Sequence, residues 1–158
     1  MPRSASATAS AQPTITPTHR AGLLRRLAAL AYDALLVGGL AFVFTLIVVL
    51  VRGGRAIDPG TLWYRAGLVV VAFAFCGVSW TRGGQTLGMK AWRIRVVALD
   101  GSAPGWPRAA LRFVASWLAL APAGLGYWWA LFDREGRCWH DVLSGTRVIR
   151  GASEPARP

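Results

Sequence analysis

The sequence predicts an α-helical membrane protein with two clear transmembrane helices and a third apolar segment that is kinked or re-entrant. Three observations indicate this fold class. Of the 158 residues, 54% are hydrophobic and only 16% are charged, well below the roughly one quarter usual for soluble domains. The apolar residues gather in the stretches 27–51, 66–80 and 113–132, and all 18 lysines and arginines lie outside them.

The first stretch is long enough to cross a bilayer. Residues 27–51 contain a single charge, Asp33, and about 20 apolar residues span a hydrocarbon core of roughly 30 Å. We expect a helix over 23–51. It is too long for a signal-peptide core and no cleavage-site pattern follows it, so it should stay in the mature protein. Residues 1–19, rich in Ser, Ala, Thr and Pro, and residues 151–158 are predicted to be disordered tails.

A second helix is expected over 62–80, with Arg65 extending toward the membrane interface. A short turn over 52–60 should join it to the first helix, because this segment contains glycines and an Asp-Pro-Gly sequence. Residues 81–90 form a glycine-rich polar connection. They lack the Gly-Lys-Ser/Thr ending of a phosphate-binding loop, so we interpret them as a turn.

Two short strands are predicted on either side of the third apolar segment. Residues 92–99 alternate basic and apolar side chains, and residues 145–150 are again rich in β-branched types. An unpaired strand would leave its backbone groups unsatisfied, so we expect these strands to pair as a small cytoplasmic, hairpin-like element. A helix should begin near Arg108, and Pro122 and Gly124 should kink or break it.

The third apolar segment decides the topology. A single crossing would divide the basic residues ten to eight between the two sides, whereas a segment that re-enters near 122–126 would divide them 15 to 3. Basic residues gather on the cytoplasmic side of a membrane, and the strand pairing requires both strands on one side. We therefore favour the re-entrant segment, with both termini in the cytoplasm, and keep the single crossing as the alternative. The expected location is the cell membrane.

Several chemistries are not supported by the residue patterns. The net charge is +11, yet no nucleic-acid recognition motif accompanies it. The two cysteines form no disulfide framework. Cys138, His140 and Asp141 are crowded within four residues, unlike the ligand spacing of structural zinc. A catalytic relay through Ser144 lacks a nucleophile elbow. We therefore predict neither a metal, nor a cofactor, nor an enzyme, and interpret His140 and Asp141 as capping or anchoring a cytosolic turn.

Asp33 is the residue that most needs a partner. A charged side chain at mid-depth costs roughly 2.5–3.5 kcal/mol, so it should face protein rather than lipid. Arg26 precedes it by seven residues and shares its helix face, with Ala29 between them. The two charges lie about 10 Å apart along the axis, so each should have another partner. We expect Arg112 or Arg108 for Asp33 and Asp141 for Arg26, while lipid contacts Leu27, Leu30 and Leu35.

Three motifs resemble those of the RDD family, a group of small bacterial membrane proteins. The first opens the first helix, the second lies in the polar connection and the strand after it, and the third closes the chain. Their residues include, in order, Arg26, Ala29 and Asp33; Gln85 and Gly88; and His140, Asp141, Gly145 and Thr146. The resemblance covers about 20–150, which we treat as one membrane domain. It implies that the family's name-giving arginine and two aspartates are Arg26, Asp33 and Asp141.

The resemblance implies little about activity, because the family lacks an established biochemistry. We carry two hypotheses. In the first, the chain takes part in cation or proton transport, or serves a transporter as a subunit, with Asp33 binding the ion. In the second, it is a non-catalytic membrane module that binds a partner protein or anionic lipid. Either would contact the bilayer and assemble with copies of itself or with another membrane protein.

Overall fold

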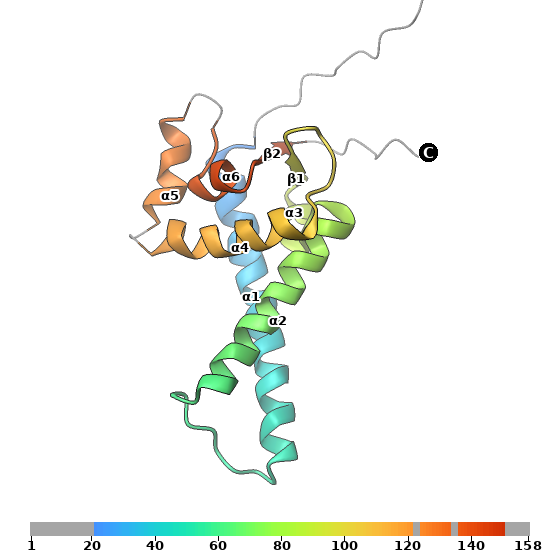
Figure 1. The fold of residues 1–158 in the computed structure, drawn as a ribbon, viewed down its shortest axis with the longest axis vertical. Helices are drawn as coiled ribbons and strands as arrows, with labels where there is room; N and C mark the ends of the chain where they lie inside the picture. The colour runs from blue at the N-terminus through green and yellow to red at the C-terminus, as the bar shows by residue number, and fades with distance from the viewer. Residues whose placement is uncertain (1–20, 122–123, 134–135, 151–158) are drawn as a thin grey trace, which may run out of the picture.

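Two long helices form the lower part of the molecule, and the remaining elements gather at one end of them (Figure 1). The computed structural model describes residues 21–121, 124–133 and 136–150. The predicted tails, 1–19 and 151–158, lie outside these ranges. We call the part formed by the start of α1 and by everything after α2 the cap. Its folded elements lie at the same end of the helix pair (Figure 1).

Helices α1 (Leu23–Val51) and α2 (Leu62–Gly83) are both long and apolar enough to cross a membrane. α1 has the predicted bounds, and α2 extends three residues beyond Trp80. Gly84 ends α2 in a left-handed conformation with φ 66°. A side chain at this position would be strained at that φ and would meet the Val96 carbonyl and Arg95. The end of α2 is therefore fixed by its contact with the following strand.

The sequence predicted a turn for the polar connection, but the structure shows more than a turn. It contains the short helix α3 (Leu87–Ala91), whose N-cap is Thr86. The Thr86 hydroxyl accepts a hydrogen bond from the Met89 amide at 3.2 Å, which satisfies a backbone donor that a helix start leaves free. The sequence did not reveal this helix, because the segment is glycine-rich and five residues are too few to show a helical period.

The two predicted strands pair, as expected. β1 (Ile94–Ala98) and β2 (Thr146–Arg150) form a two-stranded antiparallel sheet with Val96 opposite Val148. Helix α6 (Trp139–Leu143) leads into β2. Since this pairing joins the strand after α2 to the end of the folded chain, both lie at one end of the helix pair.

The third apolar segment is kinked, as predicted. Helix α4 (Trp106–Leu120) is followed by α5 (Leu125–Trp128) and the 3-10 helix η1 (Trp129–Leu131), and the two parts are bent by 105°. α4 lies across the helix pair rather than along it (Figure 1). Together with the strand pairing, this bend agrees with a segment that turns back rather than one straight crossing.

Side-chain burial along α4 is the reverse of that in a soluble helix. The helix turns small residues and one arginine inward, and it exposes large apolar side chains. Small residues let helices approach closely inside a membrane, and apolar side chains suit a lipid surface. The inward residues are Ala109, Arg112, Ala115 and Ala119; the exposed ones include Leu111, Val114 and Leu118. The predicted lipid-facing residues of α1, Leu27, Leu30 and Leu35, are likewise exposed.

Candidate functional site

Asp141 joins three separate parts of the chain. Arg26 Nη1, from α1, donates a hydrogen bond to Asp141 Oδ2 at 2.5 Å, and Arg112 Nη1, from α4, donates to Oδ1 at 2.5 Å. The Asp141 side chain is fully buried, and both guanidinium groups are almost so. The predicted pair of Arg26 and Asp141 is therefore present. The sequence did not predict that Arg112 shares the same carboxylate.

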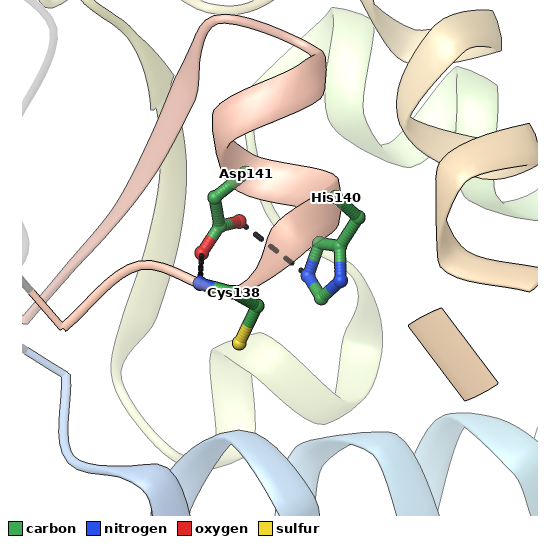
Figure 2. A group of neighbouring side chains, drawn as sticks. All are labelled: Cys138, His140 and Asp141. Atoms are coloured by element: carbon green, nitrogen blue, oxygen red, sulfur yellow. Dashed lines mark hydrogen bonds and ion pairs between the residues drawn. The ribbon is translucent and has the colours of Figure 1, made fainter. Parts of the chain in front are cut away.

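The start of α6 holds this carboxylate in place. The Cys138 amide donates to Asp141 Oδ2 at 3.0 Å, which makes Asp141 part of the cap of its own helix. Figure 2 shows this contact, together with the approach of His140 Nε2 to Asp141 Oδ1 at 3.4 Å. Arg112 Nη1 also donates to the Thr146 hydroxyl at 2.7 Å, so β2 is joined to the same cluster.

Burial and the neighbouring charges determine the protonation states of Asp141 and His140 in α6. Burial alone would raise the pKa of Asp141, but Arg112, His140 and Arg26, with the Cys138 amide, hold that pKa well below its usual range. Burial lowers the pKa of His140 to about 3, helped by the positive charges of Arg112 and Arg26 and only partly opposed by Asp141. At neutral pH the cluster therefore contains a carboxylate, two guanidinium groups and a neutral imidazole.

Cys138, His140 and Asp141 together have the ligand types of a metal site. One potential ligand atom from each lies within 4.8 Å of the others. However, both oxygens of Asp141 already accept from guanidinium groups, and the Cys138 sulfur accepts from Arg26 Nη1 at 3.3 Å. Two buried positive charges in contact with the ligand atoms would repel a cation. This donor set therefore does not suit a metal ion.

The Ser-His-Asp arrangement has no relay geometry. The Ser144 hydroxyl donates to the backbone carbonyl of His140 at 2.5 Å and lies 2.8 Å from the Thr146 hydroxyl. These contacts use Ser144 to close α6 onto β2. The predicted capping role is present for Asp141, but His140 and Asp141 lie in the helix α6 rather than in a turn, and both are buried in the cap.

Asp33 lies in a second polar site, and its predicted partners were wrong. Its carboxylate accepts a hydrogen bond from the Thr86 hydroxyl and one from the Gly88 amide at 2.8 Å. Arg112 pairs with Asp141 instead, and Arg108 lies 3.5 Å from Asp100. Among the described residues Asp33 thus has neutral partners, because the N-cap of α3 supplies donors that no charge pattern in the sequence reveals.

The depth of Asp33 also differs from the expected mid-membrane position. The 18 residues that follow Asp33, up to Val51, rise about 27 Å, close to the roughly 30 Å of a hydrocarbon core. Its partners Thr86 and Gly88 follow the end of α2. Asp33 therefore lies near one edge of the apolar layer that the helix pair can span, where α3 reaches it.

The supporting residues of the signature serve close packing. Ala29 is buried at the contact of α1 with α3, where a side chain at Gly88 would meet the Ala29 carbonyl and come within 2.9 Å of Asp33. Gln85 Nε2 donates to the Ile94 carbonyl at 2.8 Å. Gly145 has φ 59°, which favours glycine between α6 and β2. The sequence does not predict three polar residues of the two sites: Thr86, Arg112 and Cys138. Of these, Arg112 could have been found, because it is a charge beside the third apolar stretch.

The order of these motifs along the chain is that of a known family. The sequence pattern of the RDD family matches residues 20–145, most of the chain. This protein belongs to the RDD family. Searches of curated proteins and of solved structures gave no match. In this RDD protein the arginine and the second aspartate form one buried cluster with Arg112, while the first aspartate binds α3.

A cavity lies between the two sites of this RDD protein. Its volume is about 290 Å³, and its lining is almost entirely apolar. Arg112 and His140 border it from the Asp141 cluster, Asp33 from the second site, and Trp80 from the end of α2. The volume is close to the lower end of ligand pockets, roughly 300–1,000 Å³. The cavity therefore has room for a small ligand.

Proposed function

We propose that this RDD protein is a non-catalytic membrane module whose cap binds anionic lipid headgroups. The observation that carries the proposal is the charge of the cap surface. Six basic side chains are exposed there and one acidic side chain, Asp100, among the described residues. The basic ones come from the end of α2, α3, both strands or their edges, and the start of α4: Arg82, Lys90, Arg93, Arg108, Arg147 and Arg150.

The opposite end of the helix pair is less charged. Arg52, Arg55 and Arg65 are exposed there, with Asp58 as the acidic residue. Basic residues are retained on the cytoplasmic side of a membrane, and each contributes about 1 kcal/mol of attraction to an anionic leaflet. The asymmetry supports a cap on the cytoplasmic side of a bacterial cell membrane, where such a leaflet is available.

The buried charges support a structural rather than a chemical role. Asp141 holds α1, α4 and α6 together, and Asp33 holds α1 against α3. Breaking a buried ion pair leaves an uncompensated charge and is strongly destabilising. These residues thus form the rigid support from which the cap presents its basic surface. Assembly with a copy of itself or with a partner protein stays a prediction.

Lipid retention tests this function. Native mass spectrometry would measure phosphatidylglycerol bound to the purified protein for the wild type and for Arg82→Gln/Lys90→Gln. Two lost charges should weaken binding by about 2 kcal/mol. The matched control, Arg82→Lys/Lys90→Arg, keeps the charge and should retain the lipid. Equal retention by the neutral double variant would contradict the proposal. A fluorescent-protein fusion at the C-terminus, which fluoresces only in the cytoplasm, tests the orientation.

A second candidate is proton-coupled or cation-coupled transport, and one observation favours it. Asp33 borders the cavity, and its hydrogen-bond partners are the neutral Thr86 hydroxyl and Gly88 amide, so its charge is not neutralised by an ion pair among the described residues. Such a carboxylate could take up a proton or cation. Flux into proteoliposomes should then fall for Asp33→Asn, and equal flux from both proteins would remove Asp33 from any transport path.

A further inference from the structure

The cavity has one apolar end and one polar end. Leu30, Trp117 and Leu120 border it and are exposed, each at 38% or more of the side chain's accessible surface. Exposed apolar residues on α1 and α4 suit contact with lipid tails. The other end is formed by the buried residues Trp80, Arg112 and His140. The cavity thus runs from a lipid-facing opening to a buried polar wall.

Three nitrogen atoms at the polar end have no hydrogen-bond partner within the described part of the chain. They are Trp80 Nε1, Arg112 Nε and His140 Nδ1. Leaving a buried polar group unpaired costs roughly 1–3 kcal/mol, so three in one place are unusual for a wall that serves packing alone. They are close together, since Arg112 lies over the Trp80 ring at 5.3 Å and shares Asp141 with His140.

The charge balance at this end favours an anion. Arg26 and Arg112 carry two positive charges, and the carboxylate between them carries one negative charge. The neutral His140 adds none. Asp33 has the other charge on the cavity wall, but it is held by Thr86 and Gly88 and makes no ion pair in the described ranges. One positive charge of the Asp141 cluster is therefore not compensated within it.

The unpaired atoms also specify the hydrogen bonds of the ligand. Trp80 Nε1 and Arg112 Nε are donors. The neutral His140 turns Nε2 toward Asp141 Oδ1, so Nε2 carries the proton and Nδ1 is left as an acceptor. A head group that meets all three needs anionic oxygens and a hydroxyl. A singly ionised phosphate monoester has both, whereas a carboxylate has only acceptors.

We propose that this cavity binds a single-chain lipid with a phosphate monoester head, such as a lysophosphatidic acid, head inward toward Arg112 and chain outward past Trp117. The small volume admits one chain rather than two. This site is separate from the basic surface of the cap, because its polar groups are buried and its opening is apolar. Its occupant enters from the bilayer rather than from the water phase.

Photo-crosslinking tests the proposal on the full-length protein in phosphatidylcholine nanodiscs, where no anionic surface lipid is present. The probes are a lysophosphatidic acid with a diazirine in its chain and a monoacylglycerol with the same chain but no phosphate. We expect labelling by the first to exceed labelling by the second about tenfold, with labelled peptides from α1 and α4. Equal labelling by both probes would overturn the assigned head group, and so would stronger labelling by a matched fatty acid.

Two variants separate this site from general lipid contact. Ala34→Trp fills the cavity from an exposed position that borders it, and it should lower labelling at least tenfold. Ala31→Trp is the matched control, because Ala31 is also exposed on α1 but does not border the cavity. Trp80→Phe removes one donor that has no hydrogen-bond partner among the described residues, and it should lower labelling several-fold without loss of folding. Labelling of Ala34→Trp at the wild-type level would refute the cavity as the binding site.

Discussion

Arg26 and Asp141 are 115 positions apart in the sequence, and their side chains form an ion pair of 2.5 Å that is closed to solvent on both sides. This contact connects the first turn of α1 to α6. Because Arg112 reaches the other oxygen of the same carboxylate, α1 and α4 are both joined to α6 through this one residue. The stability of the cap should therefore depend on Asp141 more than on any surface charge.

Replacing Asp141 with asparagine should strongly destabilise the protein. The change leaves two buried guanidinium groups without a counter-charge, and loss of one partner from a buried pair costs about 3–5 kcal/mol. Thermal unfolding in detergent, followed by tryptophan fluorescence, measures the effect. Asp100→Asn is the control, since Asp100 pairs with Arg108 on the exposed surface, and it should leave the unfolding temperature unchanged. Equal stability of the Asp141 variant and wild type would contradict the central role of Asp141.

Asp33 should stabilise the contact between α1 and α3 through Thr86. Hydrogen bonds to a charged group contribute about 1.5–3 kcal/mol, so Asp33→Asn and Thr86→Val should each lower stability. Residues in direct contact are also coupled, by about 0.5–3 kcal/mol. A double-mutant cycle of unfolding free energies measures that coupling. Strictly additive effects of the two changes would show that the hydrogen bond contributes nothing to stability.

Gly88 should tolerate no side chain. An added Cβ would meet the Ala29 carbonyl and lie 2.9 Å from the Asp33 carboxylate, so Gly88→Ala must push α3 away from α1. Overpacking of this kind costs typically about 1–3 kcal/mol. Gly83→Ala, at the end of α2, meets no atom within 4 Å and should be neutral or slightly stabilising. A comparison of the two unfolding temperatures separates steric exclusion from a general intolerance of glycine changes.

His140 should make the protein less stable in mild acid. Its pKa is lowered to about 3 in the folded protein, while an unfolded histidine has a pKa near 6.5. The unfolded chain therefore binds the extra proton between these values. Stability is fully present above pH 6.5 and should fall by about 1.4 kcal/mol for each pH unit below it, until the folded pKa is reached.

The other groups around His140 do not reverse this direction. Asp141 on the same helix, whose pKa is also lowered, loses its contribution in the same direction but only below the pKa of an unfolded aspartate. Burial raises the pKa of Tyr127, whose ring lies 4.9 Å from the imidazole, to about 12, so this group keeps its proton between pH 4 and 7. Unfolding free energies of wild type and His140→Gln across that range test the assignment. Parallel curves for the two proteins would mean that another group is responsible.

The membrane helices, the strands and the kink were predictable because each rests on a local pattern. A run of apolar residues defines α1 and α2, a period of two defines β1, and Pro122 with Gly124 interrupts the third segment. The pair of Arg26 and Asp141 could also be anticipated, because a charge at the start of a membrane helix needs a distant partner. The short helix α3 carries no such pattern, so the sequence predicts a turn at this position.

The sequence alone predicts the two long apolar helices, the paired strands and three charged residues that require partners. The identity of those partners depends on how the chain folds. In the folded chain Asp141 pairs with two arginines. Asp33 binds the N-cap of α3, and it lies near the edge of the apolar layer rather than at its middle. The physical reason is that hydropathy acts on each segment separately, whereas a buried charge selects whichever donors the folded chain brings within about 3 Å.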